Sequence, residues 1–320
     1  MGKISNTMNH YFSDNKRFAD LFNGVWFHGH PVVDAESLTE TSEVYHEVEI
    51  ANLLTEESPG RGERIRDVRK RLDTGAELRI LALENQTFVD YSMPIRCMQY
   101  DVADYRKQID GLRRKNEREK KWKSASERFC GLRKDDRLVP VYTLCLYHGV
   151  EKWDGPRSLR DMMRFDDKED GFAEKFGDYP LHLYCLNEEQ DFHTFQTEVG
   201  LLFRALQCRK DRMSLRKLLA EVPEYRRVDA DTLEAMAVLL ELPSIWKRRK
   251  DFMIKNENDR EEYNMCQAVR EWAEEERKIG REEEKNIVVR NLILRGMPDQ
   301  DILQIVECDV KLINNVRSTI

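Results

Sequence analysis

The alternation of hydrophobic and polar positions predicts a β-hairpin over residues 64–86, which read RIRDVRKRLDTGAELRILALENQ. Two short runs flank Asp73-Thr74-Gly75, a turn signal that suits a slightly long hairpin loop. The second run, Leu78 to Leu83, is rich in Leu and Ile and is followed by Glu84, Asn85 and Gln86. Successive side chains of a strand point to opposite faces, so Glu84 and Gln86 are expected to share the face of the apolar residues Ile80 and Ala82.

Other apolar patterns predict the elements around this hairpin. Four apolar residues at helical spacing between 18 and 25 indicate a core-facing helix that ends near Asn23-Gly24, after a loose segment at 1–15. A second helix is expected to begin at Met93-Pro94, since Pro is well tolerated in the first turn. Val139 to Tyr147 is apolar and β-branched, which predicts a central strand covered on both sides. Two shorter strands are expected at 31–33 and 181–186.

The pattern becomes helical from residue 188 onward, with amphipathic helices expected at 192–206, 215–222 and 232–242. Between Glu257 and Glu284, eleven Asp and Glu outnumber five Lys and Arg, which favours a solvated helix that a partner could turn into a coiled-coil arm. The last residues read as short helices separated by a Gly turn and resemble a helix-turn-helix unit. The expected parts are therefore a core at 14–186, a helical subdomain at 188–256, a charged helical connector at 257–285 and a small helical tail at 286–320.

Composition limits the classes of partner. The chain has 320 residues, 40% hydrophobic and 35% charged, with a formal net charge of −7, so a nucleic acid must be bound by a local basic patch rather than by a basic coat. The sequence contains no apolar run long enough for a membrane span and no signal-peptide core, and we expect no membrane partner. Seven scattered cysteines without a C-x-x-C pair are typical of reduced thiols, which favours a cytoplasmic protein.

The basic patch lies at residues 111–128, GLRRKNEREKKWKSASER, where eight Lys and Arg accompany three Glu. Such a run can neutralise several phosphates and bind nucleic acid without reading its sequence. A charge run is also often a solvated face or a mobile loop. The candidate DNA-binding residues are Arg96 and, in this patch, Arg113, Arg114, Lys115, Lys120, Lys121 and Lys123.

The chemistry expected at the hairpin is that of a divalent metal site. A partner strand can bring Asp67 beside Glu84, and two carboxylates with a polar amide offer the oxygen ligands that Mg²⁺ prefers. Structural polar clusters look the same in sequence, so the spacing alone does not decide between them. Arg96, one turn into the following helix, is expected either to reach a phosphate or to pair structurally with Asp67 or Glu84. The family resemblance described next implies a further acid from a preceding helix, for which Glu47 and Glu49 are candidates.

Three segments of the chain resemble the Rpn-type (recombination-promoting nuclease) branch of the PD-(D/E)XK nuclease superfamily: RIRDV, LALENQTFVDYSMPIR and MQYDVADYRKQ. By this resemblance Asp67, Glu84 and Gln86 occupy the catalytic motif, with Gln86 where most relatives carry Lys, and the Met-Pro-x-Arg stretch follows. The resemblance covers residues 14–186. It implies an α/β fold with a restriction-endonuclease-like αβββαβ core and a helical C-terminal region.

The function implied is a Mg²⁺-dependent, or Mn²⁺-dependent, DNA endonuclease that promotes recombination or mobile-element activity. Asp67 and Glu84 would hold the metal with the main-chain carbonyl of Asn85, and Gln86 would orient the attacking water. The alternatives are a catalytically weak or inactive scaffold that binds DNA or a partner, and a toxin-like nuclease of a defence system. A homo-oligomer formed through the C-terminal helices is a further expectation.

Overall fold

The computed structural model describes residues 3–40, 68–75, 78–165, 171–188, 192–255 and 261–320. The chain divides into two compact units, described separately below. The first comprises residues 1–211 and 234–241, and the second comprises residues 212–233 and 242–320. The protein is a mixed α/β structure, as expected from the sequence, and the larger sheet lies in the first unit. The boundaries of these units do not coincide with the four sequence-based segments.

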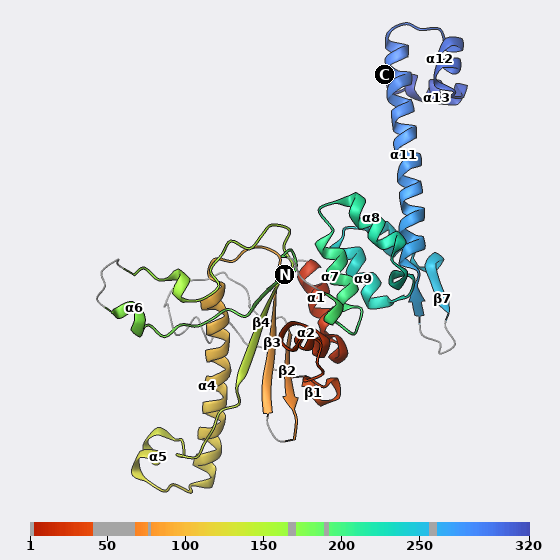
Figure 1. Cartoon of the computed structure of the whole chain (residues 1–320). Helices are drawn as coiled ribbons and strands as arrows, with labels where there is room; N and C mark the ends of the chain where they lie inside the picture. The colour runs from red at the N-terminus through yellow and green to blue at the C-terminus, as the bar shows by residue number, and fades with distance from the viewer. Residues whose placement is uncertain (1–2, 41–67, 76–77, 166–170, 189–191, 256–260) are drawn as a thin grey trace. The chain divides into compact units, whose positions relative to one another are not determined.

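The sheet of the first unit has five strands in chain order (Figure 1). Its strands are β1 (Leu38–Glu40), β2 (Val68–Asp73), β3 (Leu78–Gln86), β4 (Val141–Tyr147) and β5 (Leu183–Cys185). Strands β1 to β3 pair antiparallel, whereas β3, β4 and β5 pair parallel. The expected hairpin is therefore β2–β3, and β3 lies between β2 and β4 in the middle of the sheet.

Helices cover both faces of this sheet. Helices α1 (Lys3–Ser13) and α2 (Asn15–Phe27) lie on one face, and α4 (Met93–Glu119), the crossover between β3 and β4, lies on the other (Figure 1). Successive residues of β2 contact helices on opposite faces of the sheet. Arg69 forms an ion pair with the fully buried Asp104 of α4, whereas Lys70 Nζ donates to the main-chain oxygen of Ser13 and, at 2.5 Å, to Asn15 Oδ1.

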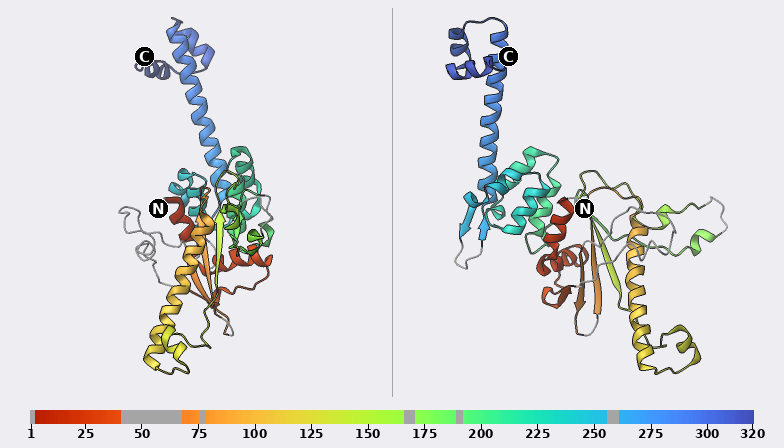
Figure 2. Two further views of the ribbon diagram at one scale, coloured as in Figure 1. Left: turned by 90° about the vertical axis from the view of Figure 1, so that its left-hand side faces the viewer. Right: turned by 180° about the vertical axis from the view of Figure 1, so that it is seen from behind.

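The C-terminal part of α4 continues beyond the sheet and carries the short helix α5 (Ala125–Cys130) near its end (Figures 1 and 2). The Asn116 amide ties this end together because it donates to Gly131 O and, at 2.7 Å, to Asp136 Oδ2. We call residues 111–137 the basic arm. The first unit also contains α6 (Phe172–Lys175) and α7 (Val199–Gln207).

The second unit is built around the 30-residue helix α11 (Met265–Leu294). Helix α8 (Arg212–Glu221) packs against it, with the Arg216 guanidinium 4.5 Å from the Trp272 ring centroid. A small sheet of β6 (Val228–Asp229), β8 (Glu261–Tyr263) and β7 (Met253–Lys255) was not predicted from the sequence. The short helix α10 (Pro243–Lys247) also belongs here, and α9 (Ala230–Leu239) is divided between the two units.

The three expected helices of the tail are confirmed as the end of α11, α12 (Asp299–Val306) and α13 (Val310–Arg317). Their small apolar core is formed by Val289, Ile302, Ile313 and Val316. An exposed ion pair between Arg317 and Asp299 links α13 to α12. None of the described helices combines the length and the apolar character needed to cross a bilayer.

Several predictions for the first forty residues were wrong. Residues 3–13 form a helix rather than a loose segment, with Met8, Tyr11 and Phe12 buried on one side. Residues 31–33 are not a strand. Helix α2 continues through Asn23-Gly24 to Phe27, because these two residues serve tertiary contacts. The Asn23 side chain binds the main chain of Val33, and Gly24 leaves room for the Phe195 ring, which would lie 2.3 Å from an added Cβ.

Candidate active site

Glu84 lies near the carboxyl end of the central strand β3 and is fully buried, with 0% of its surface exposed. Its strand register places it opposite Cys145 of β4, and Gln86 opposite Tyr147. Cys145 and Tyr147 belong to an apolar cluster with Met93 and Cys97 of α4. Glu84 and Gln86 therefore stand on the α4 face of the sheet, beside apolar packing, where a carboxylate needs a partner.

That partner is Arg96, from the first turns of α4. Its guanidinium lies 3.3 Å from Glu84 Oε2, 3.5 Å from Gln86 Oε1 and 3.0 Å from Asp90 Oδ2. Oxygen atoms of two carboxylates and one amide are thus gathered around one cation. The expectation that Arg96 approaches the Glu84–Gln86 face is met, in the form of an ion pair with Glu84.

Asp90 was missed by sequence reasoning. Its Oδ1 accepts from the main-chain nitrogen of Ser92 at 2.8 Å and from the Ser92 hydroxyl at 2.6 Å, while its Oδ2 holds Arg96. Asp90 therefore fixes the start of α4 and the position of Arg96 together. The available signal was an Asp two residues before a helix-start Ser, which is a common turn pattern.

The charges at this site support one another. Burial lowers the pKa of Arg96, but the charge of Glu84 and hydrogen bonds with Tyr100 and Asp90 outweigh it, and the net shift is upward. Burial raises the pKa of Asp90, but hydrogen bonds from Ser92 and Arg96 bring the net value below its usual range. Arg96 is therefore a permanent cation, and Asp90 is ionised at neutral pH.

The Asn85 side chain does not join this site. Its Nδ2 donates to Asn9 Oδ1 of α1 at 2.8 Å, on the opposite face of the sheet. The role predicted for Asn85 concerned its main-chain carbonyl and does not depend on the side chain. The main-chain oxygen of Gln86 accepts from His148 N at 2.9 Å, which links the ends of β3 and β4.

His148 is a second buried ionisable group at this edge that sequence reasoning missed. Only 1% of it is exposed, and neither ring nitrogen has a hydrogen-bond partner among the described residues. Burial and the nearby Arg209 charge lower the pKa of His148 to about 4. The imidazole is therefore neutral at pH 7.

Asp67, Glu47 and Glu49 lie outside the described residues. The described hairpin nevertheless ends next to Asp67 in sequence. Val68, which follows Asp67, pairs with Leu83, which precedes Glu84.

The described donor atoms are compatible with Mg²⁺, because carboxylate and amide oxygens are its usual protein ligands and one or two carboxylates often suffice. Glu84 and Gln86 contribute such oxygens from one strand face, and Asp90 contributes another beside Arg96. Within the described ranges, no group of three His, Cys, Asp or Glu side chains forms a metal-binding cluster. The residues that would hold the ion are Glu84 and the main-chain carbonyl of Asn85, together with Asp67, which lies outside the described residues.

The basic arm lies at the other end of α4 from Arg96. Arg113 follows Arg96 by 17 residues, which corresponds to about 25 Å along a helix. Arg113 and Lys123 form exposed ion pairs with Asp110 and Asp135. Of the six candidate DNA-binding residues in the basic arm, four are exposed and make no salt bridge with any residue that the structure describes: Arg114, Lys115, Lys120 and Lys121. Helix α4 is continuous from Met93 to Glu119 and separates the basic arm from Arg96.

Comparisons with protein-family models, with curated proteins and with solved structures found no match to this chain.

Proposed function

We propose that this protein is a metal-dependent DNA endonuclease of the Rpn-type branch of the PD-(D/E)XK superfamily. It would hydrolyse phosphodiester bonds with Glu84, Gln86 and Asp67 as its catalytic residues. The observation that carries the proposal is the fully buried Glu84 carboxylate, aligned with Gln86 on one strand face and held by Arg96. Burying a charge is costly, and structures keep such a group mainly where it is paired or has a chemical role.

The order of elements supports the same proposal. Helix α2 precedes the antiparallel strands β1, β2 and β3, and α4 then crosses to β4, which runs parallel to β3. This order agrees with the αβββαβ core that the resemblance implies. A parallel crossover brings the end of β3 and the start of α4 together, which is how Glu84 and Arg96 come into contact.

Each residue has a distinct proposed role. Glu84 and Asp67 hold Mg²⁺ or Mn²⁺, with Gln86 and the Asn85 carbonyl nearby. The bound metal supplies Lewis-acid polarisation and lowers the pKa of a water molecule. Gln86 orients the attacking water by hydrogen bonding, and Arg96 binds a phosphate oxygen with its permanent charge. An amide brings no positive charge where most relatives have Lys, so we expect slow turnover.

The basic arm is proposed to hold the DNA away from the point of cleavage. Arg113, the first cation of the arm, lies about 25 Å from Arg96 along α4, a length that matches about seven base pairs of B-form DNA. Its exposed cations contact phosphates and read no bases. A duplex lying along α4 would reach both ends of the helix.

The test is cleavage of supercoiled plasmid with Mg²⁺, with Mn²⁺ and with EDTA. We expect metal-dependent cutting that Glu84→Gln and Asp67→Ala each lower roughly a hundredfold or more, because loss of a metal ligand removes a charge stabilisation worth several kcal/mol. Glu283→Gln, the same change on an exposed face of α11, is the matched control and should cut like the wild type. Cutting that survives both site variants would place the activity elsewhere or in a contaminant.

One observation favours a second function, a catalytically weak scaffold that binds DNA or a partner. Glu84 already has a cationic partner in Arg96, 3.3 Å from its Oε2, so its charge is paired without a metal. DNA binding without cutting under either metal would favour this scaffold. Faster cutting of RNA than of DNA would instead favour the toxin-like nuclease, which needs the same site chemistry.

A further inference from the structure

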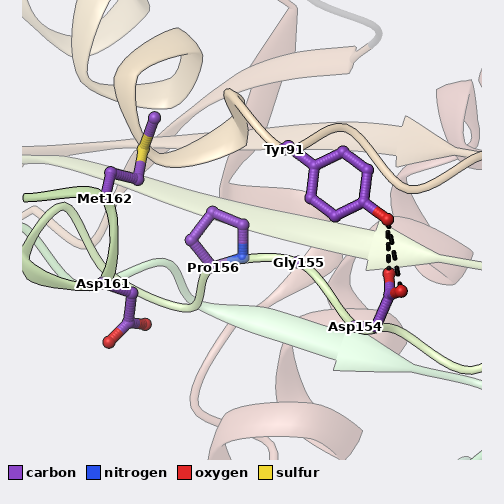
Figure 3. Close-up of a pocket in the computed structure, with 6 residues that line it drawn as sticks. All are labelled: Tyr91, Asp154, Gly155, Pro156, Asp161 and Met162. Carbon is purple, nitrogen blue, oxygen red and sulfur yellow. Dashed lines mark hydrogen bonds between the residues drawn. The ribbon is translucent and has the colours of Figure 1, made fainter.

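A cavity of about 450 Å³ is lined in part by a residue that adjoins the candidate site in the sequence. It is lined by Tyr91, Asp154, Gly155, Pro156, Asp161 and Met162 (Figure 3). Two loops form it, the one between β3 and α4 and the one that follows β4. Tyr91 is the neighbour of Asp90, which binds Arg96, so the cavity and the candidate site share one loop.

The two loops are joined by specific contacts. The Tyr91 hydroxyl donates to both carboxylate oxygens of Asp154, at 3.0 and 3.2 Å (Figure 3). Gly155 allows Val89 to approach, because an added Cβ would lie 2.9 Å from Val89 Cγ1. The ring of Tyr91 is thereby held in place although 61% of its surface is exposed. An exposed aromatic ring that is fixed by a hydrogen bond is suited to stacking with a flat ligand.

The polar groups of the cavity are hydrogen-bond acceptors. Asp154 keeps acceptor capacity beyond the Tyr91 hydroxyl, since a carboxylate has about four lone-pair positions. Asp161 Oδ2 accepts from the main-chain nitrogens of Arg157 and Ser158 and lies on a neighbouring wall. A ligand that fits these groups is flat and presents N–H donors at its edge.

Phosphates are not excluded from this surface. Residues 150–165 contain four Lys and Arg and three Asp and Glu, so the loop has no net negative charge in spite of its two aspartates. The same loop 87–92 also presents Phe88, with 82% of its surface exposed. Exposed aromatic residues next to cationic groups are typical of surfaces that bind single-stranded nucleic acid.

We propose that this cavity binds an unpaired nucleobase that carries an exocyclic amino group, cytosine, adenine or guanine, stacked on Tyr91 and hydrogen-bonded to Asp154. The proposal rests on the proposed nuclease function, since it names the substrate of that site. A duplex keeps its bases stacked, whereas a single strand, a bulge or a distorted end can place a base in such a cavity. Carboxylates accept from the amino group of cytosine. The only edge N–H of thymine, N3–H, stands between two carbonyl oxygens, which a carboxylate repels. The enzyme would therefore act where DNA is locally unpaired, and would bind thymine runs poorly.

The test measures binding separately from cutting. Fluorescence anisotropy with labelled single-stranded oligonucleotides of equal length, made of dC, dA or dT, is recorded in EDTA with the full-length protein. We expect dC and dA to bind at least about fivefold more tightly than dT. Tyr91→Ala should weaken dC binding roughly tenfold through lost stacking, and Tyr91→Phe should retain most of it. Phe172→Ala, which removes another ring with 78% of its surface exposed, is the matched control.

Asp154→Asn gives a change of preference that misfolding cannot imitate. The amide oxygen of Asn can still accept from Tyr91, but its NH₂ group donates, so the preference should shift from dC toward dT. Equal affinity for the three oligonucleotides, or no effect of Tyr91→Ala, would overturn the proposal even if plasmid is cut. Selective binding by a protein that cuts no plasmid would support the cavity and refute the nuclease.

Discussion

The two ends of helix α4 carry their charges in opposite ways. At its start, Arg96 is partly buried and contacts Glu84, Asp90 and Gln86. At its end, the candidate DNA-binding cations are exposed, and the two that pair do so with exposed acids, Asp110 and Asp135. Under the proposed function, the start of the helix would act on one phosphodiester bond with fixed geometry, whereas the end would only attract phosphates, with an energy that salt screens.

The largest effect is expected from removing the cation at the start of α4. Arg96→Met keeps the aliphatic stem and the helix propensity but leaves the Glu84 carboxylate without its guanidinium. Breaking one side of a buried pair costs about 3–5 kcal/mol of the free energy of unfolding. Urea unfolding of the wild type and the variant measures this loss.

The control for this prediction is the Arg114→Met variant at the exposed end, which should change the free energy of unfolding by about 0.5 kcal/mol or less. The double variant Arg96→Met/Glu84→Gln should recover part of the loss, because no charge is then left buried. Equal effects at Arg96 and Arg114 would break the contrast between the two ends.

The sequence predicted the start of α4 better than its surroundings. Alternation along the strand placed Glu84 and Gln86 on one face, and the helix beginning at Met93-Pro94 was confirmed, because both follow from local periodicity. The choice between a phosphate contact and an ion pair for Arg96 could not be made, since it depends on how α4 packs on β3. Asp90 was missed for the same reason.

The sequence did not predict which other charged residues of the first unit are buried. Lys70 lies in a strand with charged neighbours and reads as a solvated residue, yet it is buried and bound to Ser13 and Asn15 of the N-terminal helices. Asp20 is likewise buried and accepts from the main-chain nitrogens of Gln196 and Thr197. These partners are far away in the sequence, and one chain carries no signal that pairs them.

The second prediction concerns the exposed end and compares free with paired cations. If free cations contact DNA, Arg114→Gln/Lys121→Gln should lower the slope of log affinity against log salt by about 1.8, or 0.9 for each phosphate contact. Arg113→Gln/Lys123→Gln removes one Arg and one Lys that are engaged with Asp110 and Asp135, and should change the slope less. Binding of duplex DNA at several salt concentrations measures both. A larger change in the second variant would mean that the paired cations are the DNA contacts.

The smallest effect is expected when one aspartate from each end is compared as a function of pH. The pKa of Asp90 is lowered, with hydrogen bonds from Ser92 and Arg96 outweighing its burial, and the pKa of Asp135 is lowered by a hydrogen bond and the charge of Lys123. A lowered pKa means that the native state holds its proton less tightly than the unfolded chain, so the stabilisation is complete above the ordinary Asp pKa and is lost as pH falls through the lowered value.

The difference in Tm between wild type and Asp90→Asn should therefore be larger at pH 6 than at pH 3. Asp135→Asn should show a weaker trend that 0.5 M salt removes, because its pair with Lys123 is fully exposed, while the Asp90 trend should persist in salt. Equal salt sensitivity of the two trends would show that the start of α4 is as open to solvent as its end, and the fixed geometry on which the proposed chemistry depends would then be absent.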